Sequence, residues 1–326
     1  MSFRKFERRV MEVIIKSVAR YYLKKPGLSG IILIKIPTFK AGLFAFMHEI
    51  CYLLGLEKSF RLTNLSIEVT NYCNLGCLMC PASTQMSRRR GFIDENLFRK
   101  IIDDAFHLEL VLLFQWGEPF LHPGIFELID YVSARNIRVM ITTNGTLCSD
   151  ETIERILDSR LERLAFSVDG VGPTYTRIRG FDYGQLRASI LKLKKMRDLR
   201  KSNLKIDISM VVFEETEADI EKFMSEWRGI ADGIYLIPRF IPGVRKNRCR
   251  EIWRGNLTVL WDGRVVPCCA DFDAKMVMGD LTKEGISNIW NGVQMRELRR
   301  CHRGGVFPGI CNCCAEYANP RVHARF

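Results

Sequence analysis

The sequence of 326 residues has no low-complexity segment, no internal repeat and few prolines, 11 in all. Hydrophobic residues make up 47% of it and charged residues 26%, a composition that excludes a disordered or a fibrous chain. No paired carboxylates and no Ser–His–Asp set stand out, and the five histidines are scattered. A chain of this length can bury a sizeable core, so we expect one large α/β domain with a smaller appendage.

The N-terminus lacks the features of a secretory signal. Lys16 and Arg20 interrupt its apolar run, and no small-residue cleavage site follows. We therefore expect a cytoplasmic protein. In that reducing compartment the 12 cysteines are not expected to form a disulfide framework, and clustered cysteines there usually hold metal.

The formal net charge of +12 is unevenly distributed. Residues 1–25 carry eight lysines and arginines against two glutamates, a surplus of six and half of the total excess. Apolar residues recur beneath this basic face at helical spacing: Phe3, Phe6, Val10, Ile14, Val18 and Tyr21. Two interpretations stay open, a basic amphipathic helix peripherally bound to an anionic membrane, or a helical cap packed on the protein's own α/β domain.

A second apolar stretch, residues 41–56, is interrupted by His48 and Glu49. It is too short and too polar to predict a transmembrane span. We assign residues 1–60 to a basic helical extension.

From residue 65 onward, short β-branched runs alternate with longer amphipathic stretches, the pattern of βα units around a parallel sheet. The predicted strands are 65–70, 110–116, 137–143, 163–168, 204–212 and 233–238. The predicted helices are 94–107, 123–135, 149–159, 183–198 and 217–227, several of which open with Asp or Ser at the cap position. Six such strands build either a partial barrel or an open doubly wound sheet, and both place the active site at the carboxyl ends of the strands.

The βα rhythm stops after residue 238, where the composition shifts to Gly, Pro, Arg and Cys. We place a domain boundary near Arg239, which divides the chain into residues 1–60, 61–238 and 239–326. Runs 256–260 and 264–267 flank Trp261-Asp262-Gly263 and predict a hairpin. A helix over 287–300 and a cysteine-rich tail follow.

Cys73, Cys77 and Cys80 form a cluster directly after the first predicted strand. Three thiolates on one loop can bind three irons of a cubane and leave the fourth iron with an exchangeable position. The alternatives are a structural zinc site or three buried cysteines without a role. A closed zinc site requires four protein ligands, and no fourth is adjacent.

The spacing Cys73-x-x-x-Cys77-x-x-Cys80 resembles the signature of the radical S-adenosylmethionine (SAM) superfamily. Met79 departs from it, because an aromatic residue is usual there. The resemblance implies a partial (β/α)6 TIM-like barrel over residues 65–238 and a [4Fe–4S] cluster whose open iron binds SAM. It also implies reductive cleavage of SAM to a 5′-deoxyadenosyl radical, with a low-potential electron donor of flavodoxin or ferredoxin type.

Further motifs follow the other predicted strands in the places where the family holds SAM. Gln115-Trp116-Gly117-Glu118-Pro119 is similar to the family's GGEP loop, with Trp116 in place of the first glycine, and implies that Glu118 holds the methionine amine. Thr143-Asn144-Gly145 would lie near the ribose, and Arg179 could pair with the methionine carboxylate. The implied SAM-binding residues are Gly117, Glu118, Pro119, Thr143, Asn144, Ser167, Asp169 and Arg179. Each motif alone is a common turn sequence, but all lie at successive strand ends.

A second cysteine set lies in the C-terminal part: Cys249, Cys268, Cys311 and Cys314 could converge on one site. Four thiolates hold either zinc or an iron–sulfur cluster, and the residues alone leave both open. The arrangement resembles the SPASM/Twitch extension of radical SAM enzymes, and the Twitch form with a single auxiliary [4Fe–4S] cluster fits the spacing. The choice of Cys268 over Cys269 rests on the family pattern, and Cys301 and Cys313 are unassigned.

A second cluster near the barrel mouth can take an electron from a substrate radical, which suits oxidation of an alcohol or sugar-like carbon. The layout is similar to that of the aminocyclitol dehydrogenases of antibiotic biosynthesis. The alternatives are a peptide maturase or epimerase, modification of a lipid-linked substrate, and a non-catalytic iron–sulfur electron carrier.

Arginine runs do not indicate nucleic acid binding. Residues 88–90 and 296–303 hold short runs, which we interpret as solvated helix ends, and nucleic acid requires basic residues interleaved with aromatics across a face. Arg239, at the end of the last predicted strand, is a candidate for binding a substrate hydroxyl or carboxylate. A surface arginine entering a linker is the alternative.

Overall fold

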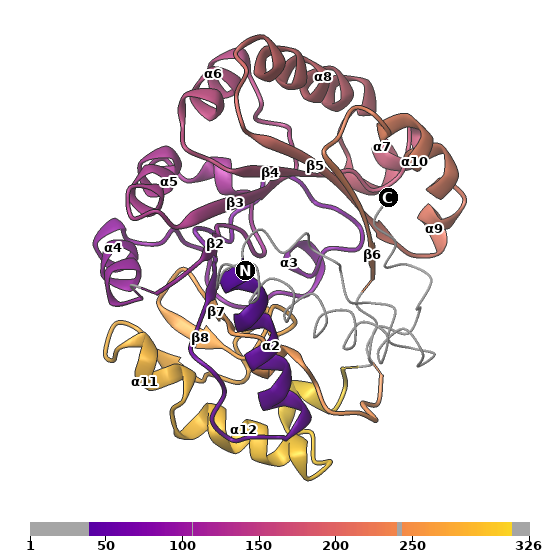
Figure 1. Ribbon diagram of the computed structural model, residues 1–326. Helices are drawn as coiled ribbons and strands as arrows, with labels where there is room; N and C mark the ends of the chain where they lie inside the picture. Colours follow the sequence, from indigo (N-terminus) through magenta and orange to yellow (C-terminus); the bar gives the residue numbers. More distant parts are fainter. Residues whose placement is uncertain (1–38, 106, 240–242, 315–326) are drawn as a thin grey trace, which may run out of the picture.

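The computed structural model describes residues 39–105, 107–239 and 243–314 (Figure 1). Its centre is a curved sheet in which six strands follow one another in parallel, listed here in chain order: β1 (Asn64–Ile67), β2 (Leu110–Leu112), β3 (Arg138–Thr143), β4 (Arg163–Ser167), β5 (Lys205–Val212) and β6 (Gly233–Pro238). β6 forms one edge of the sheet, and β1 pairs with β2 and β7 rather than with β6. The array therefore stays open, as the partial barrel requires.

Helices cover the outer side of this array (Figure 1). The crossover helices are α4 (Glu95–Asp104), α5 (Ile125–Ser133), α6 (Asp150–Asp158), α8 (Tyr183–Leu199) and α10 (Ile220–Trp227), with the shorter α3 (Pro81–Thr84), η1 (Pro119–Leu121), α7 (Pro173–Arg179) and α9 (Glu214–Glu217) in the loops. The predicted caps are present: Asp94, Ser149 and Asp182 each accept a bond from a backbone N–H three residues on.

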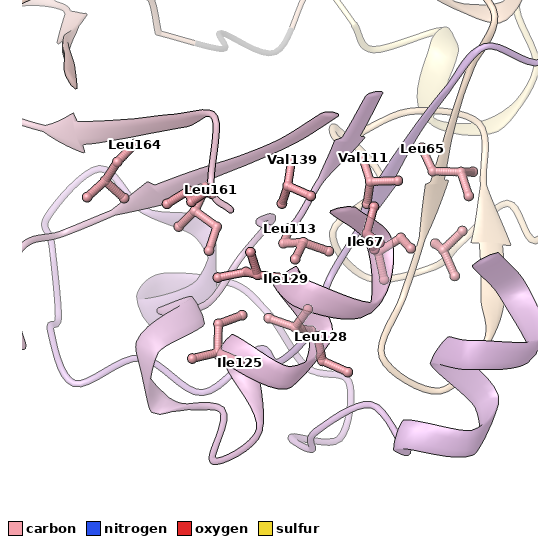
Figure 2. Close-up of a cluster of buried hydrophobic side chains, with 14 of the residues drawn as sticks. Leu65, Ile67, Val111, Leu113, Ile125, Leu128, Ile129, Val139, Leu161 and Leu164 are labelled. Carbon is pink, nitrogen blue, oxygen red and sulfur yellow. The ribbon is translucent and has the colours of Figure 1, made fainter. Parts of the chain in front are cut away.

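The core lies between the strands and these helices. Figure 2 shows Val111, Leu113 and Val139 of the sheet region facing Leu128 and Ile129 of α5, and all five are fully buried or nearly so. Each such aliphatic side chain contributes about 1.5–3 kcal/mol by its removal from water. This packing fixes the strands so that their carboxyl ends form one edge.

The C-terminal part extends the same sheet. β7 (Asn256–Val259) pairs in parallel with β1, and the predicted hairpin joins it to β8 (Arg264–Val266), which pairs with β9 (Gly279–Asp280). The single predicted helix over 287–300 is wrong. Two helices, α11 (Ile286–Trp290) and α12 (Val293–Arg303), meet at Gly292, where a Cβ would lie 2.2 Å from the Asn288 carbonyl oxygen. The boundary near Arg239 stays a prediction, and the sheet runs across it.

Helix α2 (Phe39–Leu53) packs on η2 (Glu251–Trp253) of the C-terminal part. The Tyr52 and Trp253 rings lie 5.8 Å apart, and the Trp253 indole donates to the Leu56 carbonyl oxygen at 2.7 Å. A Glu49–Arg250 ion pair of 3.1 Å adds to this contact. Helix α2 therefore packs on the C-terminal part, and the two interpretations of residues 1–25 stay predictions. No helix among the described residues is long and apolar enough to cross a membrane. The basic segment 1–25 lies outside them.

Candidate active site

The first cysteine loop follows β1 and contacts α7. Leu78 N–H donates to the Ile178 carbonyl oxygen at 3.1 Å, and Cys80 N–H donates to that of Cys77 at 3.1 Å. Burial raises the pKa of Cys77 to about 11; nearby Arg179 opposes the rise, and Cys80 and Cys73 add to it. Cys73 is exposed and Cys80 half-buried. The loop therefore gathers three thiols, one of them open to solvent, which suits a cluster with one accessible iron.

Arg90 bonds residues on both sides of this loop, and Arg88 pairs with Glu68 ahead of it, which corrects their interpretation as solvated helix ends. The Arg90 guanidinium donates to the carbonyl oxygens of Asn71 and Ala82. Arg88 is buried in an ion pair with Glu68, at 2.7 Å from Nη1 to Oε1. Arg299 on α12 was likewise assigned to a solvated end, yet it is fully buried. The number of charges in the sequence does not predict these contacts, because the partners of the arginines lie elsewhere in the sequence.

Glu118 joins the carboxyl ends of β2 and β3. Its Oε1 accepts a bond from the Thr143 hydroxyl at 2.8 Å, and its Oε2 accepts one from Asn144 N–H at 2.7 Å. The side chain is buried, and burial raises its pKa. Pro119 begins η1 next to it. The structure thus brings Glu118, Thr143 and Asn144 together; their role in binding SAM stays a prediction.

Gly117 passes against the backbone that precedes the cysteine loop. A Cβ there would lie 2.2 Å from the Thr70 carbonyl oxygen, and Glu118 N–H donates to the Tyr72 carbonyl oxygen at 2.8 Å. Only glycine permits this approach. The Asn144 amide reaches the same loop, donating to Cys73 Sγ at 3.8 Å. The predicted loops at three strand ends therefore meet around one point.

Asp169 and Arg179 form a buried pair at the next strand end. Arg179 Nε lies 2.8 Å from Asp169 Oδ2, and Asp169 Oδ1 accepts a bond from Val211 N–H at 2.6 Å. Ser167 ends β4 at the same edge. Two guanidinium nitrogens of Arg179 already bind Asp169. Its pairing with a methionine carboxylate stays a prediction, and the pair places a nearly neutral unit beside Cys77.

The second cysteine set is brought together by segments far apart in sequence. Burial raises the pKa of Cys311 to about 12, with further rises from Cys249 and Cys314, while Arg245 opposes them. Burial also raises the pKa of Cys268, and Cys269, Cys249 and Cys311 act in the same direction. Cys314 N–H donates to the Cys311 carbonyl oxygen at 3.4 Å, and the convergence of all four predicted thiols on one site stays a prediction. In the described part of the chain, no three His, Cys, Asp or Glu side chains stand close enough to share one metal ion.

Two of the remaining cysteines of this part bond neighbours in their own segments, and the choice of Cys268 over Cys269 stays a prediction. Cys301 donates to Glu297 on its own helix at 3.7 Å, and Cys313 donates to the Ile310 carbonyl oxygen at 3.5 Å. Cys269 is exposed beside Cys268. Arg239 is exposed as well, with its guanidinium 5.2 Å from the centre of the Phe213 ring. Its substrate role stays a prediction.

Two further contacts connect the cysteine sites. The Trp116 indole, beside Gly117, donates to the Cys269 carbonyl oxygen at 2.9 Å and meets the Phe272 ring edge to face at 6.0 Å. Ser87 N–H donates to Asp273 at 2.8 Å. The signal for Trp116 was present in the sequence, because this residue departs from the GGEP pattern. The aromatic side chain at that position reaches the second site.

Comparisons with known proteins agree with this geometry. A model of the radical SAM superfamily matches residues 67–226, and a model of the SPASM iron–sulfur cluster-binding domain matches residues 249–315. A tungsten-containing aldehyde ferredoxin oxidoreductase cofactor-modifying protein of Pyrococcus furiosus is 24% identical over 311 residues, covering 76% of this chain and 86% of the relative. The S-adenosyl-L-methionine-dependent 2-deoxy-scyllo-inosamine dehydrogenase of Niallia circulans is 24% identical over 271 residues, covering 79% and 94%.

Among solved structures, BtrN in complex with AdoMet and 2-DOIA superposes with a TM-score of 0.57 at 17% identity, over 82% of this chain and 96% of that one. This likeness shows the fold. The SPASM match names an iron–sulfur domain where the residues alone also allowed zinc. The family implies SAM and [4Fe–4S] clusters as cofactors, and the thiols described above fit them. The chain therefore belongs to the radical SAM superfamily, as an enzyme with a C-terminal SPASM-type iron–sulfur domain.

Proposed function

We propose that this enzyme is a dehydrogenase that oxidises an alcohol or sugar-like carbon and carries a single auxiliary [4Fe–4S] cluster. The observation that carries the proposal is the bond from the Trp116 indole, in the loop beside Gly117 and Glu118, to the Cys269 carbonyl oxygen, because it joins the proposed SAM-binding loop to the segment that carries Cys268. The likeness to the inosamine dehydrogenase over most of both chains supports the reaction class. We also propose that the domain boundaries lie after residues 60 and 238.

In this proposal Cys73, Cys77 and Cys80 hold the first cluster. SAM bound there supplies the 5′-deoxyadenosyl radical on one-electron reduction. Glu118 lies where a buried carboxylate can hold the methionine ammonium, because Thr143 and Asn144 fix both of its oxygens. Fixing that ammonium orients the rest of SAM with respect to the three thiols.

Oxidation of an alcohol to a ketone removes one hydrogen atom, one proton and one electron from the substrate. The hydrogen atom on the carbinol carbon goes to the 5′-deoxyadenosyl group, and the hydroxyl proton goes to solvent or to a nearby base. The four C-terminal thiols would hold the group that accepts the electron. We also propose a flavodoxin-type or ferredoxin-type protein as the external donor for SAM cleavage.

Anaerobic reconstitution tests the two-cluster assignment. We expect about eight irons per chain, four for each cubane, and release of 5′-deoxyadenosine on reduction with SAM. Cyclitols and sugar alcohols deuterated at the carbinol carbon should then transfer deuterium to 5′-deoxyadenosine as the ketone forms. Zinc at the C-terminal site, or deuterium transfer from a peptide but from no alcohol, would contradict the dehydrogenase proposal.

Peripheral membrane binding through residues 1–25 is a separate proposal that rests on their basic surplus. Flotation with vesicles containing anionic lipid at low salt should carry the full chain upward. Neutral vesicles serve as the control. A chain that stays at the bottom with both vesicle types contradicts membrane binding.

A further inference from the structure

Arg245 lies directly against the second cysteine set. Its Nη2 donates to Cys314 Sγ at 3.0 Å, and its Nη1 donates to the Asn247 carbonyl oxygen at 3.2 Å. Its backbone N–H donates to the Asn312 carbonyl oxygen at 3.2 Å, and the residue is 9% exposed. The guanidinium is thus fixed from both of its ends beside one cluster thiol.

Arg245 carries a positive charge. A guanidinium stays protonated in proteins, and its bond to Cys314 Sγ places this charge directly against a thiol of the set. His302 also borders this set, because its Nδ1 accepts a bond from Cys249 N–H at 3.2 Å. The carboxylates of Glu251 and Asp271 also act on these thiols. Arg245 is therefore a cation in direct contact with one thiol of the set.

A buried positive charge at a cluster ligand favours the more reduced state. Reduction adds one negative charge, and both nearby charge and hydrogen bonds to the ligand sulfur shift the potential of an iron–sulfur cluster. In a site shielded from water this electrostatic effect is weakly screened. We propose that Arg245 is a positioning residue that raises the reduction potential of the auxiliary cluster, so that the site accepts the electron released by the substrate. This inference rests on the proposed function.

The test isolates the auxiliary cluster in the full chain. Cys73, Cys77 and Cys80 are replaced by Ala together, and the remaining cluster is titrated by EPR-monitored redox potentiometry. We expect R245Q to lower the reduced-to-oxidised ratio at a fixed ambient potential at least tenfold, about 59 mV for a one-electron couple. R245K, which keeps the charge, should stay within about threefold of the parent on the same scale.

R248Q is the matched control, because Arg248 is a nearby arginine that stacks on Tyr52 and Trp253 instead of bonding a thiol. Its potential should change by less than that of R245Q. Equal potentials for R245Q and its parent, both with four irons, overturn the inference, as does a shift in R248Q as large as that in R245Q. If R245Q retains no iron, R245K decides: a potential near the parent's supports the role of charge, and a tenfold lower ratio overturns it.

Failure of the proposed function is visible separately in this experiment. A parent chain without iron at the C-terminal site removes the auxiliary cluster and the dehydrogenase proposal with it. A parent with four irons and unchanged potentials in both Arg245 variants removes only the inference.

Discussion

The two cysteine sites are built in opposite ways. The first takes three thiols from eight consecutive residues, leaves Cys73 exposed, and lies next to the buried carboxylate of Glu118 and the Asp169–Arg179 pair. The second gathers thiols over residues 249–314 and has Arg245 against one of them. A carboxylate beside a cluster disfavours its reduction, and a guanidinium bonded to a ligand thiol favours it. In the proposed two-cluster enzyme, this difference suits the first cluster to donate an electron and the second to accept one.

The largest contrast is expected on deleting one thiol from each site. C77A should reduce 5′-deoxyadenosine formation to the uncatalysed level, because SAM then has no cluster to reduce it. C311A should retain SAM cleavage and lose ketone formation. Quantifying both products by liquid chromatography and mass spectrometry separates the two roles. Equal loss of 5′-deoxyadenosine in both variants would break the comparison.

The buried Glu68–Arg88 pair should contribute more to the stability of the fold than an exposed ion pair does. R88M leaves the Glu68 carboxylate, which is fully buried, without its charged partner and should lower the free energy of unfolding by about 3–5 kcal/mol. R99M removes an exposed pair with Glu95 and should cost less than about 1 kcal/mol. Urea unfolding of the metal-free chains measures both. Similar losses of unfolding free energy in the two variants would show that the stability of the fold does not depend on the Arg88 pair.

Acid should destabilise the C-terminal side through His48, which is buried on α2. Burial lowers its pKa to about 4, whereas the ordinary value is 6.5. Its neutral form therefore stabilises the fold fully above pH 6.5, and this contribution, on the order of 3 kcal/mol, is lost as pH falls toward 4. Urea midpoints measured across that range should fall. H48Q should flatten the curve, and an equally steep curve for H48Q would assign the pH dependence to other groups.

The smallest effect is expected from the contact between Trp116 and the backbone of Cys269. W116F keeps an aromatic ring against Phe272 but loses the bond to the Cys269 carbonyl oxygen, worth about 1 kcal/mol. We expect 5′-deoxyadenosine to form at the parent rate while the ketone formed per 5′-deoxyadenosine falls severalfold. F120L, a change within η1 of the same loop, is the control. An unchanged ratio in W116F would remove Trp116 from the coupling.

Local patterns predicted much of this molecule. All six parallel strands lie where the β-branched runs stand. The cysteine spacing predicts the first site from the sequence alone, because its proposed ligands are neighbours in the chain. β2 ends at Leu112 instead of residue 116, since the loop that carries Gly117 must turn toward Thr70. Arg88 and Arg299 could not be assigned in advance. Their partners are separated by up to 242 residues, and a side chain's charge alone does not say whether water or a carboxylate meets it.

Because β7 pairs with β1, the C-terminal part also stabilises the barrel sheet. β1 leads directly to the Cys73 loop, and its other flank is hydrogen-bonded to the strand that leads into the hairpin before Cys268. A chain ending near residue 239 would leave a row of backbone donors and acceptors of β1 uncovered, a template for pairing with other molecules. The iron–sulfur appendage therefore also covers an edge of the barrel sheet, and the loss of residues 240–326, 87 in all, should first cause aggregation.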